Sequence, residues 1–154
     1  MNIHPELEQQ LDDFDAAERR KALGVLCSEY GDGLPETVTN VNMHCHSFYS
    51  YNAEGYSPSH IVWEARKRGL YAAGLCDFDV LDGLEEFLQA GRVAALRTTV
   101  NVETRAFVEA LSSVDIRSPG EPGVCYVMAS GFGRAPAADS EQAETLRRFR
   151  EGAA

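Results

Sequence analysis

Apolar residues near the start of the chain recur every three or four positions, which is the spacing of an amphipathic helix. This stripe consists of Leu7, Leu11, Phe14, Ala17, Ala22, Val25 and Leu26. Gly31 and Gly33 are expected to end the helix, because glycine is common at helix ends, and Pro35 follows in a loop. We therefore expect residues 1–35 to form an N-terminal amphipathic helix with its loop, and residues 36–154 to form the main domain.

Beyond residue 35, short apolar runs alternate with longer amphipathic stretches. Strands are predicted at residues 41–46, 70–76, 98–102 and 124–128. Ser57 and Pro58 open the first intervening helix as its cap and its first residue, and a second helix runs through Leu84 and Phe87. A last helix begins near Asp139 in a capping-box pattern. Because this alternation is typical of βαβ units, it predicts an α/β fold with a parallel sheet of about four βα units.

Length and composition narrow the classes of protein. A chain of 154 residues with 44% hydrophobic and 25% charged residues is an ordinary single globular domain, which excludes disordered and collagen-like proteins. The 24 acidic side chains outnumber 14 basic ones and give a net charge of −10. Because such a surface repels nucleic-acid phosphates at long range, non-specific nucleic-acid binding is disfavoured.

The sequence also bears on where the protein works. No apolar run approaches the roughly 20 residues that cross a bilayer, and the first residues lack the features of a signal peptide. The four cysteines lie far apart without a Cys-x-x-Cys pair, which indicates reduced thiols rather than disulfides. These features predict a soluble cytoplasmic protein that has no membrane partner.

Polar side chains follow three successive predicted strands at their carboxyl ends, which is where α/β enzymes place their sites. They are His44 with His46, then Asp77, then Glu103. Because His44 and His46 are two positions apart on a strand, both imidazoles project from one face and can reach one metal ion. Mixed imidazole and carboxylate ligands suit Zn, Mn or Fe. The competing interpretation is a hydrogen-bonded pair of core histidines.

The acidic residues of this set have more than one interpretation. Glu103 is either a metal ligand that bridges two cations or an exposed acid at a strand end. Asp77 is a metal ligand, an acceptor for a histidine N–H, or the cap of a turn, because an unpaired charge would be costly to bury. Asp77 and Glu103 are the candidate catalytic residues, whereas Asp79 and Asp82 are expected in a turn and at a helix cap.

Other polar residues are interpreted as parts of the scaffold. Ser47 and Ser50 are expected in a loop, since no Gly-x-Ser-x-Gly motif accompanies them. His60 falls in the first turn of a helix, where a cation is disfavoured, and is expected to be a neutral surface residue. Arg97 and Arg105 flank the third strand, where a solvated position is favoured over contact with an anionic substrate.

The stretch from Asn42 to Glu103 resembles the polymerase and histidinol phosphatase (PHP) superfamily. The sequence Met-His-Cys-His-Ser at residues 43–47 is similar to the first motif of that family, His-x-His-Thr/Ser. Cys-Asp-Phe-Asp at residues 76–79 is similar to the second motif, usually Thr-Asp-His-Asp. Glu103 follows at about the spacing of the strand-end glutamate of the family.

This resemblance implies a distorted (β/α)7 barrel that holds two or three divalent metal ions and hydrolyses phosphoesters of small molecules. By position, His44 and His46 would bind the first metal ion, and Glu103 would bridge the first and second. Two cations of this kind can activate a water molecule and stabilise the charge on the leaving oxygen.

The chain also departs from the pattern of the family. Phe78 replaces the histidine of the second motif, and Asn52 stands where some members have a further histidine. These two positions serve the same third metal ion in members that have one, so we expect this chain to lack that site. The family also has two histidines after the glutamate and a closing Asp-x-His, whereas no histidine follows His60 here.

The length adds a further expectation. A (β/α) barrel needs roughly 200 residues or more, and a half barrel would leave a sheet edge and an apolar face uncovered. We therefore expect the N-terminal half of a PHP domain, completed by a C-terminal half or by a second copy, or else a truncated relative. The expected function is metal-dependent phosphoester hydrolysis. The alternatives are a non-catalytic metal-binding or protein-interaction module on the same fold, and purely structural histidines.

Overall fold

The computed structural model describes residues 4–53 and 55–153, so residues 1–3 of the predicted N-terminal segment and residues 54 and 154 of the predicted main domain lie outside the described part. The helices are α1 (Pro5–Gln9), α2 (Ala16–Tyr30), α3 (Pro58–Lys67), α4 (Leu84–Val93) and α5 (Glu141–Ala153). The strands are β1 (Val41–Cys45), β2 (Ala72–Phe78), β3 (Arg97–Phe107) and β4 (Val124–Ser130), which form one sheet in that order. The described helices are all too short or too polar to cross a membrane.

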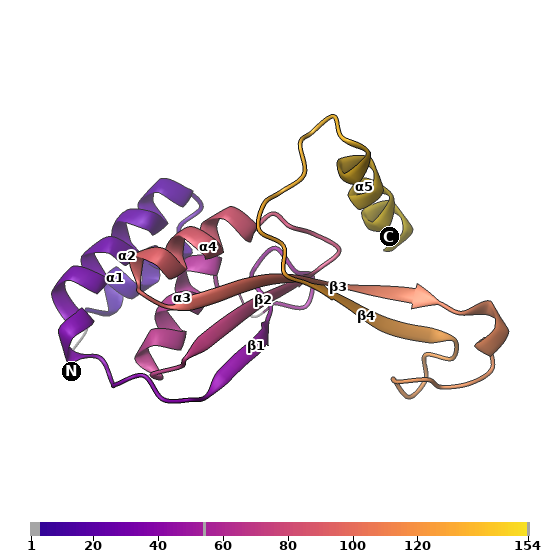
Figure 1. The fold of residues 1–154 in the computed structure, drawn as a ribbon, viewed down its shortest axis with the longest axis horizontal. Coiled ribbons are helices and arrows are strands. Elements are labelled where there is room, and N and C mark those ends of the chain that lie inside the picture. The colour runs from indigo at the N-terminus through magenta and orange to yellow at the C-terminus, as the bar shows by residue number, and fades with distance from the viewer. Residues whose placement is uncertain (1–3, 54, 154) are drawn as a thin grey trace.

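The sheet is parallel in β1–β3 but not in β4. β1 pairs with β2, and β2 with β3, in parallel, whereas β3 and β4 form an antiparallel pair (Figure 1). The prediction of an α/β fold is confirmed, and the prediction of a parallel fourth strand is wrong. A parallel return needs a long crossover, usually a helix, but residues 108–123 contain the 3-10 turn Glu109–Leu111 and an isolated bridge between Asp115 and Pro122, and no helix that could cross over. Gly123 closes this connection with a φ of +80°.

The helices lie on one face of the sheet. α3 and α4 cover that face, α2 packs outside them, and α5 lies beside β3 (Figure 1). Trp63 of α3 and Phe87 of α4 are fully buried in the core, which extends to Val100 on β3 and to Leu26 on α2. The N-terminal segment therefore shares one hydrophobic core with the sheet. No described helix covers the opposite face of the sheet.

The predicted N-terminal helix is interrupted. α1 continues into a 3-10 turn (Gln10–Asp12), and α2 begins only at Ala16. Asp15 caps α2 by accepting a hydrogen bond from the Ala17 N–H (2.8 Å), and Asp13 accepts one from the Asp15 N–H (2.7 Å). Such local carboxylate bonds compete with helix continuation. Phe14 consequently lies fully exposed in the break, so its predicted place on the apolar stripe is wrong.

A buried ion pair joins this break to α3 and α4. The Arg19 side chain is 2% exposed, and its Nε donates to Glu86 Oε1 (2.9 Å) while Nη2 pairs with Oε2. Its Nη1 donates to the backbone carbonyls of Asp13 and Phe14. Glu86 Oε1 also accepts hydrogen bonds from the backbone N–H and the hydroxyl of Ser59. These contacts connect three segments that are far apart in sequence.

His60 is buried at the start of α3, which contradicts its predicted surface position. It is 8% exposed, its Nδ1 lies 2.6 Å from Asp12 Oδ2, and its ring stacks on Tyr56 at a centroid distance of 4.0 Å. Asp12 also accepts a hydrogen bond from the Ser57 N–H (2.7 Å). The N-terminal segment thus folds over the first turn of α3, a contact that local sequence patterns do not encode. Ser57 caps α3 as predicted, accepting from the His60 N–H.

We predict that Arg19→Met lowers the free energy of unfolding by about 3 kcal/mol, because it leaves Glu86 with an unpaired, mostly buried charge. Lys21→Met on the same helix is the matched control. Lys21 pairs with Glu18 at the surface, where both side chains are largely exposed, so its loss should cost less than about 1 kcal/mol. Urea denaturation of both variants measures the difference. Equal losses would show that the buried pair contributes no more than a surface pair.

Candidate metal centre

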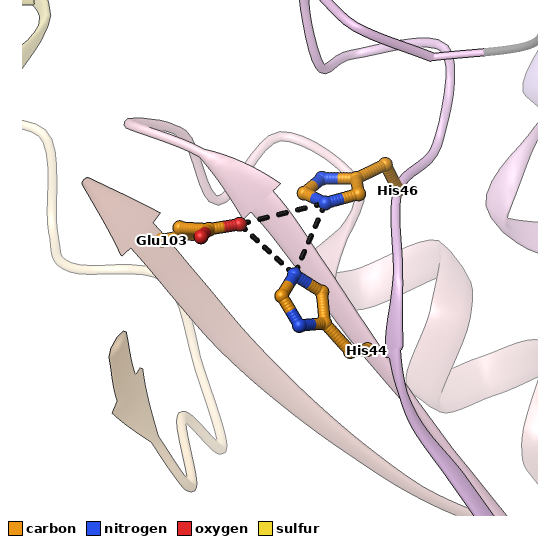
Figure 2. Close-up of side chains that lie close together, drawn as sticks. All are labelled: His44, His46 and Glu103. Atoms are coloured by element: carbon orange, nitrogen blue, oxygen red, sulfur yellow. Dashed lines mark hydrogen bonds and ion pairs between the residues drawn. The ribbon is translucent and has the colours of Figure 1, made fainter. Parts of the chain in front are cut away.

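Three side chains converge on the face of the sheet that carries no described helix. His44 Nε2 lies 3.1 Å from His46 Nε2 and 2.9 Å from Glu103 Oε2, and His46 Nε2 lies 3.5 Å from the same oxygen (Figure 2). The Glu103 side chain is 9% exposed, that of His46 is 19% exposed and that of His44 is 43% exposed. The cluster is thus buried on its carboxylate side and open on its histidine side.

The strands place these residues together in a simple way. His44 is on β1 and His46 directly follows it, so the alternation of the strand sends both imidazoles to the same face. Glu103 pairs with Phe78 at the end of β2, and β2 separates β1 from β3. Strands two apart lie about 9–10 Å from each other, so the side chains must meet above β2.

Gly74 allows β1 to come close to β2 at this point. A Cβ at Gly74 would lie 2.6–2.9 Å from backbone atoms of Met43, the residue before His44. The pairing of β1 with β2 also shifts register between Asn42 and Cys45. A side chain at position 74 would therefore push away the segment that carries His44.

Asn101 fixes the same segment from β3. Its amide Nδ2 donates to the Met43 carbonyl oxygen across β2 (3.1 Å), and the residue is 5% exposed. Its Oδ1 is buried without a hydrogen-bond partner in the described structure. An unpaired buried acceptor costs free energy, which offsets part of what the Nδ2 hydrogen bond contributes to stability.

His46 has the protonation state that a metal ligand needs. Burial and the neighbouring His44 lower its pKa below the ordinary value, so the ring is neutral at pH 7. Ser50 Oγ donates its proton to Asn52 Oδ1 (2.7 Å) and lies 3.3 Å from His46 Nδ1. Nδ1 is then the ring nitrogen that carries the proton, and Nε2 presents its lone pair to the cluster. The Phe78 ring stacks on the imidazole ring of His46 (5.2 Å between centroids, 7° between planes).

The three ligand atoms fit a transition-metal ion. Ligand atoms of a tetrahedral site with bonds of about 2.0–2.1 Å lie about 3.3–3.4 Å apart, and the separations here are 2.9–3.5 Å. Two imidazole nitrogens and one carboxylate oxygen are donors that Zn, Mn and Fe accept. Among the described residues, this is the group of histidine, cysteine and acidic side chains close enough to share an ion.

Asp77 lies outside this cluster. It is 1% exposed, and its two carboxylate oxygens accept hydrogen bonds from the Ser47 N–H and the Ser47 hydroxyl (2.6 Å each). Burial raises the pKa of the Asp77 carboxyl, although both hydrogen bonds from Ser47 oppose this effect. Since Ser47 follows His46, Asp77 fixes the backbone that carries this imidazole. Sequence reasoning gave Ser47 only a place in a loop and missed this contact.

Comparison with models of known protein families finds no match, and comparison with curated proteins finds none either. Among solved structures, the chain is similar to a candidate metal-dependent phosphoesterase from Bifidobacterium adolescentis. The two share 27% sequence identity over 49% of this chain and 26% of that protein, with a TM-score of 0.43. The chain therefore spans about a quarter of that protein, and a TM-score below 0.5 does not establish a shared fold.

We predict that Gly74→Ala weakens metal binding about tenfold or more, because the added methyl group displaces Met43 and with it His44. Gly24→Ala is the matched control. No atom lies within 4 Å of a Cβ there, and alanine should stabilise α2 by about 0.5–1 kcal/mol without changing the affinity. Calorimetric titration with Zn²⁺ and Mn²⁺ measures both variants. Unchanged affinity in Gly74→Ala would contradict the importance of the close approach.

Proposed function

We propose that this chain is a metal-dependent phosphoester hydrolase of the PHP type, with a Zn, Mn or Fe ion bound by His44, His46 and Glu103. The observation that carries the proposal is the convergence of these three ligand atoms at the carboxyl ends of parallel strands. The phosphoester part of the proposal is supported by the resemblance of residues 43–47 and 76–79 to the PHP motifs. The substrate in this proposal is a phosphorylated small molecule.

Each residue has a distinct part in the proposal. His44 and His46 supply neutral ligands, and Glu103 supplies the negative charge that the ion requires. When bound, such an ion polarises a phosphoryl oxygen and lowers the pKa of a bound water molecule. Asp77 is a positioning residue, since Ser47 occupies both of its carboxylate oxygens. The parallel strands β1–β3 correspond in this proposal to the first strands of a (β/α)7 barrel, from which the antiparallel β4 departs.

A specific observation favours a second candidate function, a non-catalytic metal-binding or interaction module. Phe78 occupies the histidine position of the second motif and stacks on His46. Asn52, at the other position assigned to a third metal ion, is hydrogen-bonded to Ser50. Neither residue adds a ligand to the three-residue cluster. This candidate predicts metal binding without hydrolysis, whereas purely structural histidines predict neither.

We predict that the chelator-treated chain takes up close to one Zn or Mn ion, and that His44→Ala, His46→Ala and Glu103→Gln each abolish this uptake. His4→Ala is the matched control, because His4 is exposed and does not belong to the cluster. Elemental analysis after gel filtration measures the content. A free metal concentration of 100 times the Kd should also raise the free energy of unfolding by about 2.7 kcal/mol. Equal metal content in all variants would exclude this site.

We also predict metal-dependent hydrolysis of p-nitrophenyl phosphate. Chelation should reduce the rate to that of the buffer, and addition of the metal should restore it, because the ion would act as the Lewis acid of the reaction. Glu103→Gln should be inactive, whereas His4→Ala should match the wild-type chain. Release of p-nitrophenol measures the rate. A metal-loaded chain without activity towards this ester would favour the non-catalytic module, and activity that survives chelation would refute a metal-dependent reaction.

A further inference from the structure

Arg105 lies beside the metal centre with its hydrogen-bond donors unused. It follows Glu103 by two positions on β3, so both side chains belong to the same face of the sheet. Its side chain is 38% exposed, and among the described residues it makes no side-chain hydrogen bond. Its ion pair is with Glu121, at 3.8 Å from Nη1 to Oε1, which is too long for a hydrogen bond.

A row of aromatic rings connects Arg105 to the metal ligands. The guanidinium carbon lies 5.6 Å from the centroid of the Tyr51 ring. Tyr51 packs on Phe78 at 4.8 Å, and Phe78 stacks on His46. Tyr126, opposite Arg105 in the β3–β4 pair, also contacts Phe78, at 6.0 Å. These contacts link the guanidinium, through Tyr51 and Phe78, to the His46 ring.

Arg105 places a positive charge near the cluster in a chain that is acidic overall. The chain carries a net charge of −10, yet Arg105 lies on the same face of the sheet as Glu103 and the two imidazoles of the cluster. Tyr126 donates its hydroxyl proton to Glu121 Oε2 (3.0 Å), so the carboxylate beside Arg105 already has another partner. An arginine binds phosphate through two parallel N–H···O bonds, which are stronger than a long surface ion pair.

We propose that Arg105 binds the phosphate group of the substrate and makes the site selective for phosphomonoesters over phosphodiesters. A monoester has three terminal oxygens: two fit the guanidinium fork, and the third can face the metal cluster. A diester has only two, so a two-bond contact with the guanidinium leaves no terminal oxygen free for the metal cluster. This inference rests on the proposed function and adds a substrate class and a substrate-binding residue to it.

The reaction in this proposal is a simple hydrolysis. The oxygen of a water molecule forms a new bond to phosphorus, and the bond between phosphorus and the ester oxygen breaks. A proton from the water goes to the departing alcohol, and inorganic phosphate remains. Arg105 exchanges no proton and forms no covalent bond, because its guanidinium stays charged throughout.

Arg97 provides a matched control within the same strand. Its guanidinium also lies over a tyrosine, with 4.1 Å between the guanidinium carbon and the centroid of the Tyr71 ring. It pairs with Ala72 at the start of β2, six positions before Glu103, which is about 20 Å along a strand. The two arginines therefore share residue type, strand and stacking partner type, but only Arg105 is near the cluster.

The test uses two probes that contain no phosphoester bond and therefore cannot be hydrolysed: phenylphosphonate, with three terminal oxygens, and methylphenylphosphinate, with two. Calorimetry gives the Kd of each for the wild-type chain, Arg105→Gln, Arg105→Lys and Arg97→Gln, in metal-loaded and metal-free form. We expect the wild-type chain to bind phenylphosphonate about tenfold or more tightly than the phosphinate. Arg105→Gln should lose this preference, Arg105→Lys should keep part of it, and Arg97→Gln should match the wild-type chain.

The outcomes separate this inference from the proposed function. If Arg105→Gln binds phenylphosphonate as tightly as the wild-type chain in both forms, or if the wild-type chain binds neither probe, the inference is wrong. A chain that takes up no metal overturns the proposed function, and the metal-free titrations then still decide whether Arg105 binds phosphate. If Arg97→Gln lost as much affinity for phenylphosphonate as Arg105→Gln, the loss would come from the change in net charge, and the inference would also be wrong.

Discussion

The candidate metal centre depends on the close approach of β1 to β2 at Gly74. Ligands on β1 and β3 can meet only above the intervening strand, because strands two apart are about 9–10 Å from each other. Gly74 leaves room for the Met43 backbone, and Asn101 anchors the Met43 carbonyl from β3. The two contacts bring His44 within hydrogen-bonding distance of Glu103. A backbone contact outside the cluster thus controls the position of His44 relative to Glu103.

The two faces of the sheet carry different parts of the structure, the hydrophobic core on one and the candidate metal centre on the other. The face under α3 and α4 carries the hydrophobic core, and the buried pair of Arg19 with Glu86 attaches the N-terminal segment to it. The opposite face carries the cluster, Phe78 and Arg105, and no described helix covers it. The residues of the cluster do not belong to the hydrophobic core. Substituting them therefore removes the candidate ligand atoms without removing core contacts, and the chain should stay folded. This separation is what makes the ligand variants interpretable.

The antiparallel hairpin extends the functional face beyond the parallel sheet. β2 ends at Phe78, opposite Glu103, whereas β3 continues to Phe107 paired only with β4 (Figure 1). Arg105 and Tyr126 lie on this extension, directly past the cluster. A parallel fourth strand after a helical crossover would have placed other residues there. The antiparallel hairpin, which departs from a regular βα repeat, is thus the feature that carries the Arg105 guanidinium beside the candidate metal centre.

The sequence by itself determined the features that depend on neighbouring residues. Strand alternation put His44 and His46 on one face, and Ser57 with Pro58 marked the start of α3. The glycine within β2 was a signal for a close backbone approach, which sequence reasoning did not use. Only the tertiary structure decided the direction of β4, the burial of His60 under Asp12, the pairing of Asp77 with Ser47 and the span of Asn101 to Met43. Those contacts join residues that are far apart in the chain, and local periodicity and capping carry no information about which distant partners meet.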